Sequence, residues 1–503
     1  MPVSRNASTR GGHIAPNRPL RRAVLSVAIG VGLAVGGTPA WSADLLDIYA
    51  LAEQNDQQLR SAEQQRLSVE QNIPIQRADL LPQVGGNAGV DYTHTRVLAG
   101  GFPNSSDVTK GSGHNLGLSL SQTIYNRSEN LQLDIAQLQV HQAAIDYEQA
   151  RQDLILRAGQ AYFQVLNADA QLQLAKANRT ALTRQLERAQ RQYEVGLVAV
   201  TDVADAQSEY DQANAQIIQA RNALNNAEAA LQTIVGKPLT DLDDIRTNLD
   251  VAKPEPADPQ DWIDLAVEQN LGLQSAVVGT RIAQQNVDVA RSQRAPTVSL
   301  EGSYGYDSSP SQFGNRSETL NGQVGVQLNL PIYTGGRINA QSRQAAFDYQ
   351  RSQYDLEAQR RQVSQQTSDS YRGVQTSISQ ITAYRQAVES ARTSLVATEA
   401  GYGVGTRTIV DVLNAELRVF EAMANYLDAR YGYITNLLQL KADTGQLTVA
   451  DLAAINRQLT DQETNALIAP LMGRGDENGA STADTEMMQR VLERARQTVN
   501  GED

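Results

Sequence analysis

Residues 193–202 read Tyr-Glu-Val-Gly-Leu-Val-Ala-Val-Thr-Asp, and residues 402–411 read Tyr-Gly-Val-Gly-Thr-Arg-Thr-Ile-Val-Asp. In both, a Val-Gly pair follows a long stretch without proline. Glycine at this place is typical of the end of a helix, and a second periodic stretch after it indicates a returning helix. We therefore predict two helical hairpins, whose tips are residues 195–202 and 404–411.

The stretches that lead to the tips have a heptad pattern. From Arg127 to Tyr193 there is no proline and one glycine, and apolar residues recur every seven positions. The second half carries the same repeat between Val374 and Tyr402. Such heptads predict long helices that pack as coiled coils.

Further from the tips, four segments alternate strictly between apolar and polar residues. They are residues 83–93, 116–124, 298–307 and 323–332. A period of two predicts strands with one apolar and one polar face, and their length suits a transmembrane β-barrel. The intervening segments Arg96–Gly113 and Ser308–Asn321 are rich in Gly, Ser and Asn and predict loops.

A helix precedes each pair of strands. It is predicted over Leu46–Leu81 in the first case and Trp262–Ala295 in the second, and a proline follows each. Each half of the chain therefore has the order helix, two strands, very long helix, helix. We predict an internal duplication, with a first structural repeat at residues 44–250 and a second at residues 251–460.

The two ends of the chain differ from these repeats. Residues 1–43 contain five arginines and no acid, then a short apolar stretch and small residues, which is the layout of a secretory signal peptide. Residues 461–503 are acidic with little apolar pattern and predict a flexible C-terminal tail.

Composition excludes several classes of protein. The 503 residues include no cysteine and four histidines, and the net charge is −13. No disulfide, cysteine nucleophile or lipid-bearing cysteine is therefore available, and the histidines are not at metal-ligand spacing. An exported acidic protein does not favour nucleic acid as a partner. We predict no enzyme activity, no catalytic residue, no metal and no cofactor.

Four strands cannot close a barrel, and an open sheet edge cannot face lipid. Closure therefore needs several chains: two would leave little lumen, whereas three would enclose an open one. The predicted fold class is mainly α with transmembrane β. An exported coiled-coil structural or adhesion protein without channel activity is the alternative, but it does not explain the four barrel-type strands.

The layout resembles the TolC family of outer-membrane channels over nearly all of residues 44–447, and most specifically in the tip segments Tyr193–Leu197 and Tyr402–Leu413. The resemblance implies a homotrimer, with a twelve-strand barrel in the outer membrane continuous with a twelve-helix periplasmic tunnel. It also implies mixed coil and helix at the waist, at residues 239–259 and after Gly445. Because it has no cysteine that could carry a lipid, the chain resembles the unlipidated branch of the family.

The same resemblance implies partners and a function. Such a channel is the exit duct of a tripartite efflux pump or a type I secretion system, and it passes drugs or proteins to the exterior. A periplasmic adaptor (membrane fusion) protein would join it to an inner-membrane transporter of the ABC, RND or MFS type. Outer-membrane lipid would surround the barrel, and the channel would be gated at its periplasmic aperture.

The resemblance assigns three groups of residues to the tips. The aperture residues are Asp411 and, one helical turn on, Asn414, where the family carries a second acidic ring. The gate links between neighbouring tip helices are Gln185, Thr201, Asp202, Tyr402 and Arg407. The adaptor-docking residues are Val195, Gly196, Leu197, Val404, Gly405 and Thr406.

Plainer interpretations of these residues remain open. In them, Asp411 is a solvated first-turn residue that suits the helix dipole, and Thr201 and Asp202 are an N-cap pair. The Val-Gly pairs are then helix C-caps, which is compatible with a docking role.

Overall fold

In the computed structural model, all described residues lie within one compact unit, Ser42–Asp503. The described residues are 43–98, 108–239, 242–311, 313, 315–460 and 467–468. The predicted signal peptide lies outside them apart from Ala43, and so does the predicted tail apart from Leu467 and Ile468.

The first predicted helix is three helices instead of one. They are α1 (Leu45–Asn55), α2 (Gln57–Glu70) and α3 (Asn72–Ala78). Asp56 interrupts the run: its backbone is extended, and its carboxylate accepts a hydrogen bond from the Leu59 amide at 2.7 Å. An internal N-cap of this kind ends one helix and starts the next.

Asn270 does the same in the second half, where the prediction of one helix is also wrong. It separates α6 (Pro259–Gln269) from α7 (Leu271–Ser292), and its side chain accepts a hydrogen bond from the Leu273 amide at 2.9 Å. Asp56 and Asn270 have nearly the same backbone angles, with ψ of 121° at both. Both breaks therefore come from a short polar side chain that accepts a hydrogen bond from a backbone amide in place of a helical carbonyl group.

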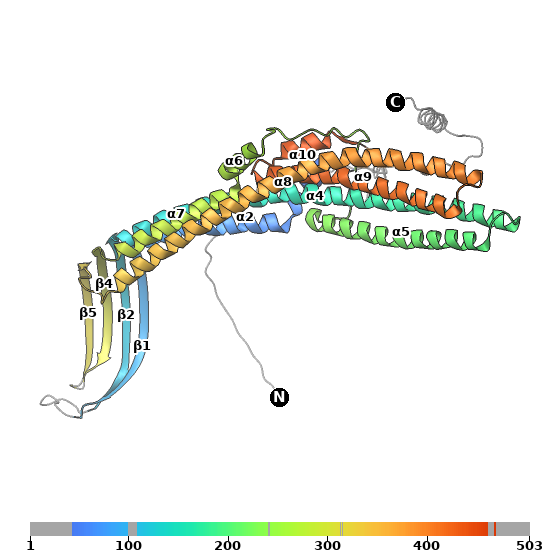
Figure 1. Ribbon diagram of the computed structural model, residues 1–503. Coiled ribbons are helices and arrows are strands. Elements are labelled where there is room, and N and C mark those ends of the chain that lie inside the picture. Colours follow the sequence, from blue (N-terminus) through green and yellow to red (C-terminus); the bar gives the residue numbers. More distant parts are fainter. Residues whose placement is uncertain are drawn as a thin grey trace, which may run out of the picture. The chain divides into compact units, whose positions relative to one another are not determined.

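The four predicted strands form one antiparallel sheet in the order β1-β2-β4-β5 (Figure 1). Their bounds are Gln83–Arg96 for β1, Val108–Tyr125 for β2, Thr297–Pro310 for β4 and Arg316–Asn329 for β5. The strands extend into both segments predicted as loops, because backbone pairing continues at the polar ends, as between Thr95 and Thr109. The last predicted strand ends earlier, at Asn329.

The sheet has one apolar face, and that face is exposed. Val84, Val90 and Val324 are 75%, 77% and 79% exposed. Directly paired residues share a face, so the register gathers the same apolar set from all four strands. Its exposed large members also include Tyr92, Leu116, Leu118, Tyr304, Leu320, Val326 and Leu328.

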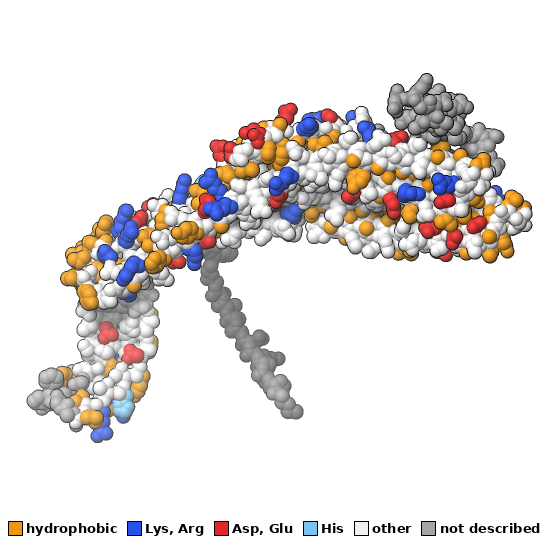
Figure 2. Space-filling model, in the orientation of Figure 1, with side chains coloured by type: hydrophobic (Ala, Val, Ile, Leu, Met, Phe, Trp, Pro, Cys, Tyr) orange, Lys and Arg blue, Asp and Glu red, His pale blue; other side chains and the backbone are white. Residues whose placement is uncertain are grey.

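The opposite face is polar and rich in glycine. Three polar side chains lie over cross-strand glycines: Asn87 over Gly117, Asp91 over Gly113, and Asn115 over Gly89. A Cβ atom added at Gly117 would come within 2.6 Å of the Asn87 side-chain oxygen, so glycine leaves room for that side chain. Figure 2 shows the sheet with mostly uncoloured side chains and few charges.

The long helices were predicted correctly. They form two hairpins, α4 (Arg127–Glu194) with α5 (Val200–Val235) and α8 (Arg337–Gly403) with α9 (Ile409–Asp443). At about 1.5 Å per residue, the 68 residues of α4 span about 100 Å. The tip-distal parts of α4 and α8 pack on α7, and α3 packs on α4.

The main apolar core lies where α4 meets α9, α1 and α10 (Val449–Asn456). Tyr162 and Phe163 are both fully buried there and meet edge to face, with 5.3 Å between ring centroids. Gly159, one turn earlier, lets α4 approach α9: an added Cβ would be 2.8 Å from Leu438. The buried seam residues agree with the predicted coiled-coil packing.

The predicted waist is mixed coil, short strand and helix, as expected. β3 (Asp244–Ile245) pairs with β6 (Leu459–Thr460), beside α10. Exposed acidic side chains lie along α6, and Figure 2 shows them over that helix. Within the described part of the chain, no helix is both long and apolar enough to cross a membrane.

Candidate functional site at the hairpin tips

The two tips have the same backbone conformation. α4 and α8 each end one residue before a valine, and the following Gly196 and Gly405 have φ of 75° and 79°. The next amide, of Leu197 or Thr406, donates to the carbonyl five residues earlier, at 2.8 and 2.9 Å. This is a Schellman-type C-cap, which confirms the C-cap interpretation of both Val-Gly pairs.

Apolar side chains at these tips point into solvent. Val195, Leu197 and Val404 are 69%, 74% and 77% exposed. Nothing lies within 4 Å of a Cβ added at Gly196 or Gly405, so both glycines also border open space. Each tip therefore presents a small apolar surface without a partner in the described chain.

The start of α5 corrects one prediction. The helix begins at Val200 with Ala199 as its N-cap, so Thr201 and Asp202 lie inside the first turn and are not an N-cap pair. No side chain caps this helix. Asp202 therefore keeps its carboxylate for other partners and suits the positive end of the helix dipole.

The start of α9 is tightly capped by Asp411. Its Oδ2 accepts hydrogen bonds from the Thr408 amide and hydroxyl, both at 2.9 Å, and its own amide donates to Thr408 Oγ1 at 3.2 Å. These bonds, helped by the nearby charges of Arg407 and Arg418, hold the pKa of Asp411 below its usual value. The first-turn interpretation of Asp411 is thus correct, and its second carboxylate oxygen remains for a further role.

Asn414 lies one helical turn after Asp411 and is exposed. Residues three apart on a helix share a face, so the two side chains follow one another along α9. Neighbouring Arg418 folds back, and its Nε donates to the Asn414 carbonyl at 3.2 Å.

The predicted gate residues come together in part. The Tyr402 hydroxyl donates to Gln192 Oε1 at 2.8 Å, which joins α8 to α4 within one chain. Burial, followed by the nearby charge of Asp202, raises the pKa of Tyr402. A Cβ added at Gly401 would lie 2.8 Å from the side chain of Arg407, so that side chain folds against its own tip.

Gln185 has a different neighbour, which the sequence reasoning missed. It is 5% exposed and its side chain lies beside Glu416 of α9, which is 8% exposed. Burial, followed by the charge of Glu399, raises the pKa of Glu416 to about 7. The signal was present in the sequence, because Glu416 interrupts the apolar stripe formed by Val412, Leu413 and Val419.

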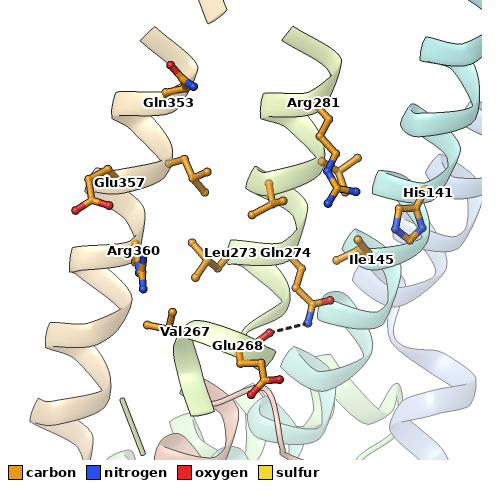
Figure 3. Close-up of a pocket in the computed structure, with 13 residues that line it drawn as sticks. His141, Ile145, Val267, Glu268, Leu273, Gln274, Arg281, Gln353, Glu357 and Arg360 are labelled. Atoms are coloured by element: carbon orange, nitrogen blue, oxygen red, sulfur yellow. Dashed lines mark hydrogen bonds between the residues drawn. The ribbon is translucent and has the colours of Figure 1, made fainter. Parts of the chain in front are cut away.

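A separate cavity of about 540 Å³ lies among α4, α6, α7 and α8, away from the tips. Figure 3 shows Arg281, Arg360, Glu268 and Glu357 among the residues that line it. Apolar side chains, including that of Leu273, also line it. Two guanidinium groups balance two carboxylates, so the lining selects no charge.

The described residues contain no group of three or more His, Asp or Glu side chains that could hold a metal ion. What the tips offer is exposed apolar surface, a capped carboxylate, and polar contacts between two hairpins. Such features suit docking and gating.

Comparison with known proteins agrees with this arrangement. The chain is 36% identical to outer membrane protein TolC of Vibrio cholerae over 87% of its own length and 98% of that protein. It is 32% identical to the alkaline protease secretion protein AprF of Pseudomonas aeruginosa, over 85% of this chain and 89% of the relative. The fold matches the Campylobacter jejuni CmeC outer membrane channel with a TM-score of 0.68 and 18% identity, over 92% of this chain and 98% of that one.

A family model described as outer membrane efflux protein matches residues 48–237 and 262–446. These two ranges include every strand of the four-stranded sheet and both hairpins. The chain therefore belongs to the outer membrane efflux protein family.

Proposed function

We propose that the protein is an outer-membrane channel with a long periplasmic extension, the exit duct of a tripartite efflux pump or type I secretion system. It passes drugs or proteins from an inner-membrane transporter to the exterior. Family membership supports this, and so does the similarity to AprF, an alkaline protease secretion protein. The relatives named are channel and secretion proteins, which supports a function without catalysis.

The open sheet carries the proposal. Its apolar face is exposed while its polar face carries glycine and short side chains, the reverse of a water-soluble sheet with a buried apolar side. A transmembrane barrel needs this distribution, with apolar side chains toward lipid and polar ones toward the lumen.

Closure of the sheet requires further copies of the chain. β1 and β5 are the edge strands, each paired on one side only. Apolar side chains are also exposed on the flanking helices: Ile75 on α3 is 56% exposed, and Phe347 and Tyr354 on α8 are 68% and 76% exposed. In a trimer, β5 of one copy pairs with β1 of the next, which gives twelve strands and a lumen wide enough to stay open. An internal duplication would place the second hairpin as an equivalent of the first.

At the periplasmic end, Asp411 from three copies forms an acidic ring and Asn414 a polar amide ring. Block by trivalent cations is expected, weaker than in a channel with two acidic rings. Arg407 bonds Thr201 and Asp202 across neighbouring tip helices, beside Tyr402 and Gln185. Exposed links of this kind stabilise by about 0–1 kcal/mol each, which suits a gate that a partner opens.

The exposed tips are the docking surface for a periplasmic adaptor. Val195, Gly196 and Leu197 form one tip contact, and Val404, Gly405 and Thr406 the other. Open space at the two glycines supports close approach of a partner backbone.

Planar-bilayer recording tests the function. The purified full-length protein should run as a heat-modifiable trimer and insert as discrete cation-preferring channels. The exported coiled-coil alternative predicts a detergent-independent protein without conductance. Monomeric protein that never forms channels would refute the proposal.

The gate links have a separate test: the variant Arg407→Ser should raise the conductance of the channel if they hold the closed state.

A further inference from the structure

The two hairpins touch near their tips through polar side chains of one face of α4. Gln192 accepts a hydrogen bond from the Tyr402 hydroxyl of α8, and Gln185, two helical turns earlier, lies beside Glu416 of α9. Residues seven apart on a helix lie on the same face. α4 therefore presents one amide to each helix of the other hairpin.

The Glu416 contact is buried and incompletely satisfied. Glu416 Oε2 and Gln185 Oε1 are both buried, and neither has a hydrogen-bond partner among the described residues. Both atoms are acceptors when Glu416 is ionised, so neither can satisfy the other. A proton on Glu416 supplies the missing donor and removes the cost of a buried charge.

The charged groups around Glu416 oppose each other. Burial of the carboxyl group between the hairpins, followed by the charge of Glu399 of α8, favours the protonated form, whereas Arg184, Gln185 and Arg188 of α4 favour the ionised form. On the α5 side, Glu209 lines the adjacent cleft with Leu413 and Leu417. Apolar packing surrounds the site, since Leu413 and Val419 are 5% and 1% exposed.

We propose that Glu416 is a gate residue whose protonated form holds the α8–α9 hairpin against the α4–α5 hairpin and whose ionised form loosens it. The proposal rests on the channel function given above. It differs from the Asp411 ring because Glu416 is buried inside each single chain and needs no neighbouring copy.

The direction of the pH effect follows from the raised pKa. In the unfolded chain Glu416 ionises near its ordinary value of 4.5, and in the closed contact near 7. Exposure of the carboxyl group when the hairpins separate removes the largest cause of this increase in pKa. The contact is therefore strongest in acid and weakens as pH rises through about 7. Asp411, whose pKa lies below its ordinary value, remains ionised across that range.

Spin labels on the two tips test this directly. The chain has no native cysteine, so Leu197→Cys with Val404→Cys adds one label site to each hairpin at an exposed position. Labelled full-length protein, diluted with unlabelled chains, is measured at about pH 5.5 and about pH 8.5. We expect longer inter-tip distances at the higher pH, and no change in the Glu416→Gln background, since the amide cannot ionise.

Glu421→Gln is the matched control, because it removes an acid of the same helix at an exposed position and should keep the pH response. Conductance of the same proteins should rise up to about tenfold over this range, and by less than about twofold in Glu416→Gln. An unchanged pH response in Glu416→Gln, or none in the parent, overturns the proposal. A distance change without any channel conductance would support the Glu416 contact and refute the channel function instead.

Discussion

At the residue scale, Asp411 has a structural role as a helix cap and a proposed functional role at the aperture. One carboxylate oxygen completes the cap of α9 with Thr408. Because a cap needs only an acceptor whereas an electrostatic ring needs a charge, two substitutions separate the roles.

Asp411→Asn should lower the preference of the channel for cations over anions, since it removes three charges from a proposed trimer. Thr408→Val should keep that preference but destabilise the start of α9 by about 1 kcal/mol, because the hydroxyl is lost. Reversal potentials under a salt gradient measure the first effect and thermal unfolding the second. Equal selectivity in the parent and Asp411→Asn would contradict the aperture assignment.

Asp56 and Arg157 form a bidentate ion pair. Asp56 is 3% exposed, and Arg157 donates to both of its oxygens at 3.0 and 3.1 Å. Burial alone would raise the pKa of Asp56, but the bonds from Arg157 and from the Leu59 amide lower it overall. Its contribution to stability is therefore complete above the ordinary value of 3.8 and is lost as pH falls through the lower folded-state pKa.

Asp56→Asn should lower the free energy of unfolding by about 2–4 kcal/mol, because Arg157 loses its charged partner while one buried cap is weakened. Glu70→Gln, which breaks the more exposed pair with Arg66, should cost about 0.5 kcal/mol or less. Denaturant titration of the detergent-solubilised protein compares the two. A similar decrease in the free energy of unfolding in both variants would show that burial does not make the Asp56–Arg157 pair more stabilising than an exposed pair.

At the element scale, the single glycine of α4 sets how closely two helices pack. Gly159→Ala places a methyl group 2.8 Å from fully buried Leu438. Overpacking costs about 1–3 kcal/mol, more than the gain in helix propensity of up to about 1 kcal/mol, so the variant should be less stable.

The double variant Gly159→Ala, Leu438→Ala should recover part of that loss, which a double-mutant cycle measures as a favourable coupling. Gly432→Ala of α9 is the matched control, because nothing lies within 4 Å of the added Cβ, and it should be neutral or stabilising. A stabilising Gly159→Ala would disprove the close contact.

The tip glycines allow a comparable test of docking. Gly405→Trp should abolish export while leaving the level of assembled protein unchanged, since the side chain enters open space that an adaptor would fill. Gly335→Trp is the matched control. Gly335 also has a positive φ, of 63°, and nothing lies within 4 Å of an added Cβ atom, but it precedes α8 at the end of that helix opposite to the tip. Retained export in Gly405→Trp, or its loss in both variants, would refute docking at the tip.

The sequence predicts the long elements well and their interruptions poorly. Heptads without proline define α4, and strict alternation defines the strands. A helical periodicity does not show that Asp56 or Asn270 caps a new helix in mid-run, because capping depends on local backbone geometry. Glu416 was missed for a related reason: an acid on an apolar stripe is recognisable only when burial is weighed with charge.

At the scale of the whole molecule, the two faces of the sheet should respond oppositely to the same charge. Val324→Arg places a cation on the apolar face and should reduce assembly in the outer membrane. The free energy of the inserted state should be less favourable by about 2–4 kcal/mol per copy if the residue lies near the bilayer centre. Gln323→Arg, one residue earlier on the polar face, should assemble normally and reduce cation preference. Fractionation of outer membranes with bilayer recording distinguishes the two, and equal assembly of both variants would argue against a lipid-facing sheet.

The cross-strand glycines would have a further consequence in the proposed twelve-strand barrel. Asn87, Asp91 and Asn115 lean over their glycine partners, so the lumen-facing surface of the proposed barrel would carry few side chains that obstruct a moving polypeptide. An unfolded polypeptide would then slide past with low friction, and its transit time would depend on its length more than on its sequence. A duct built in this way suits one exit for many kinds of cargo.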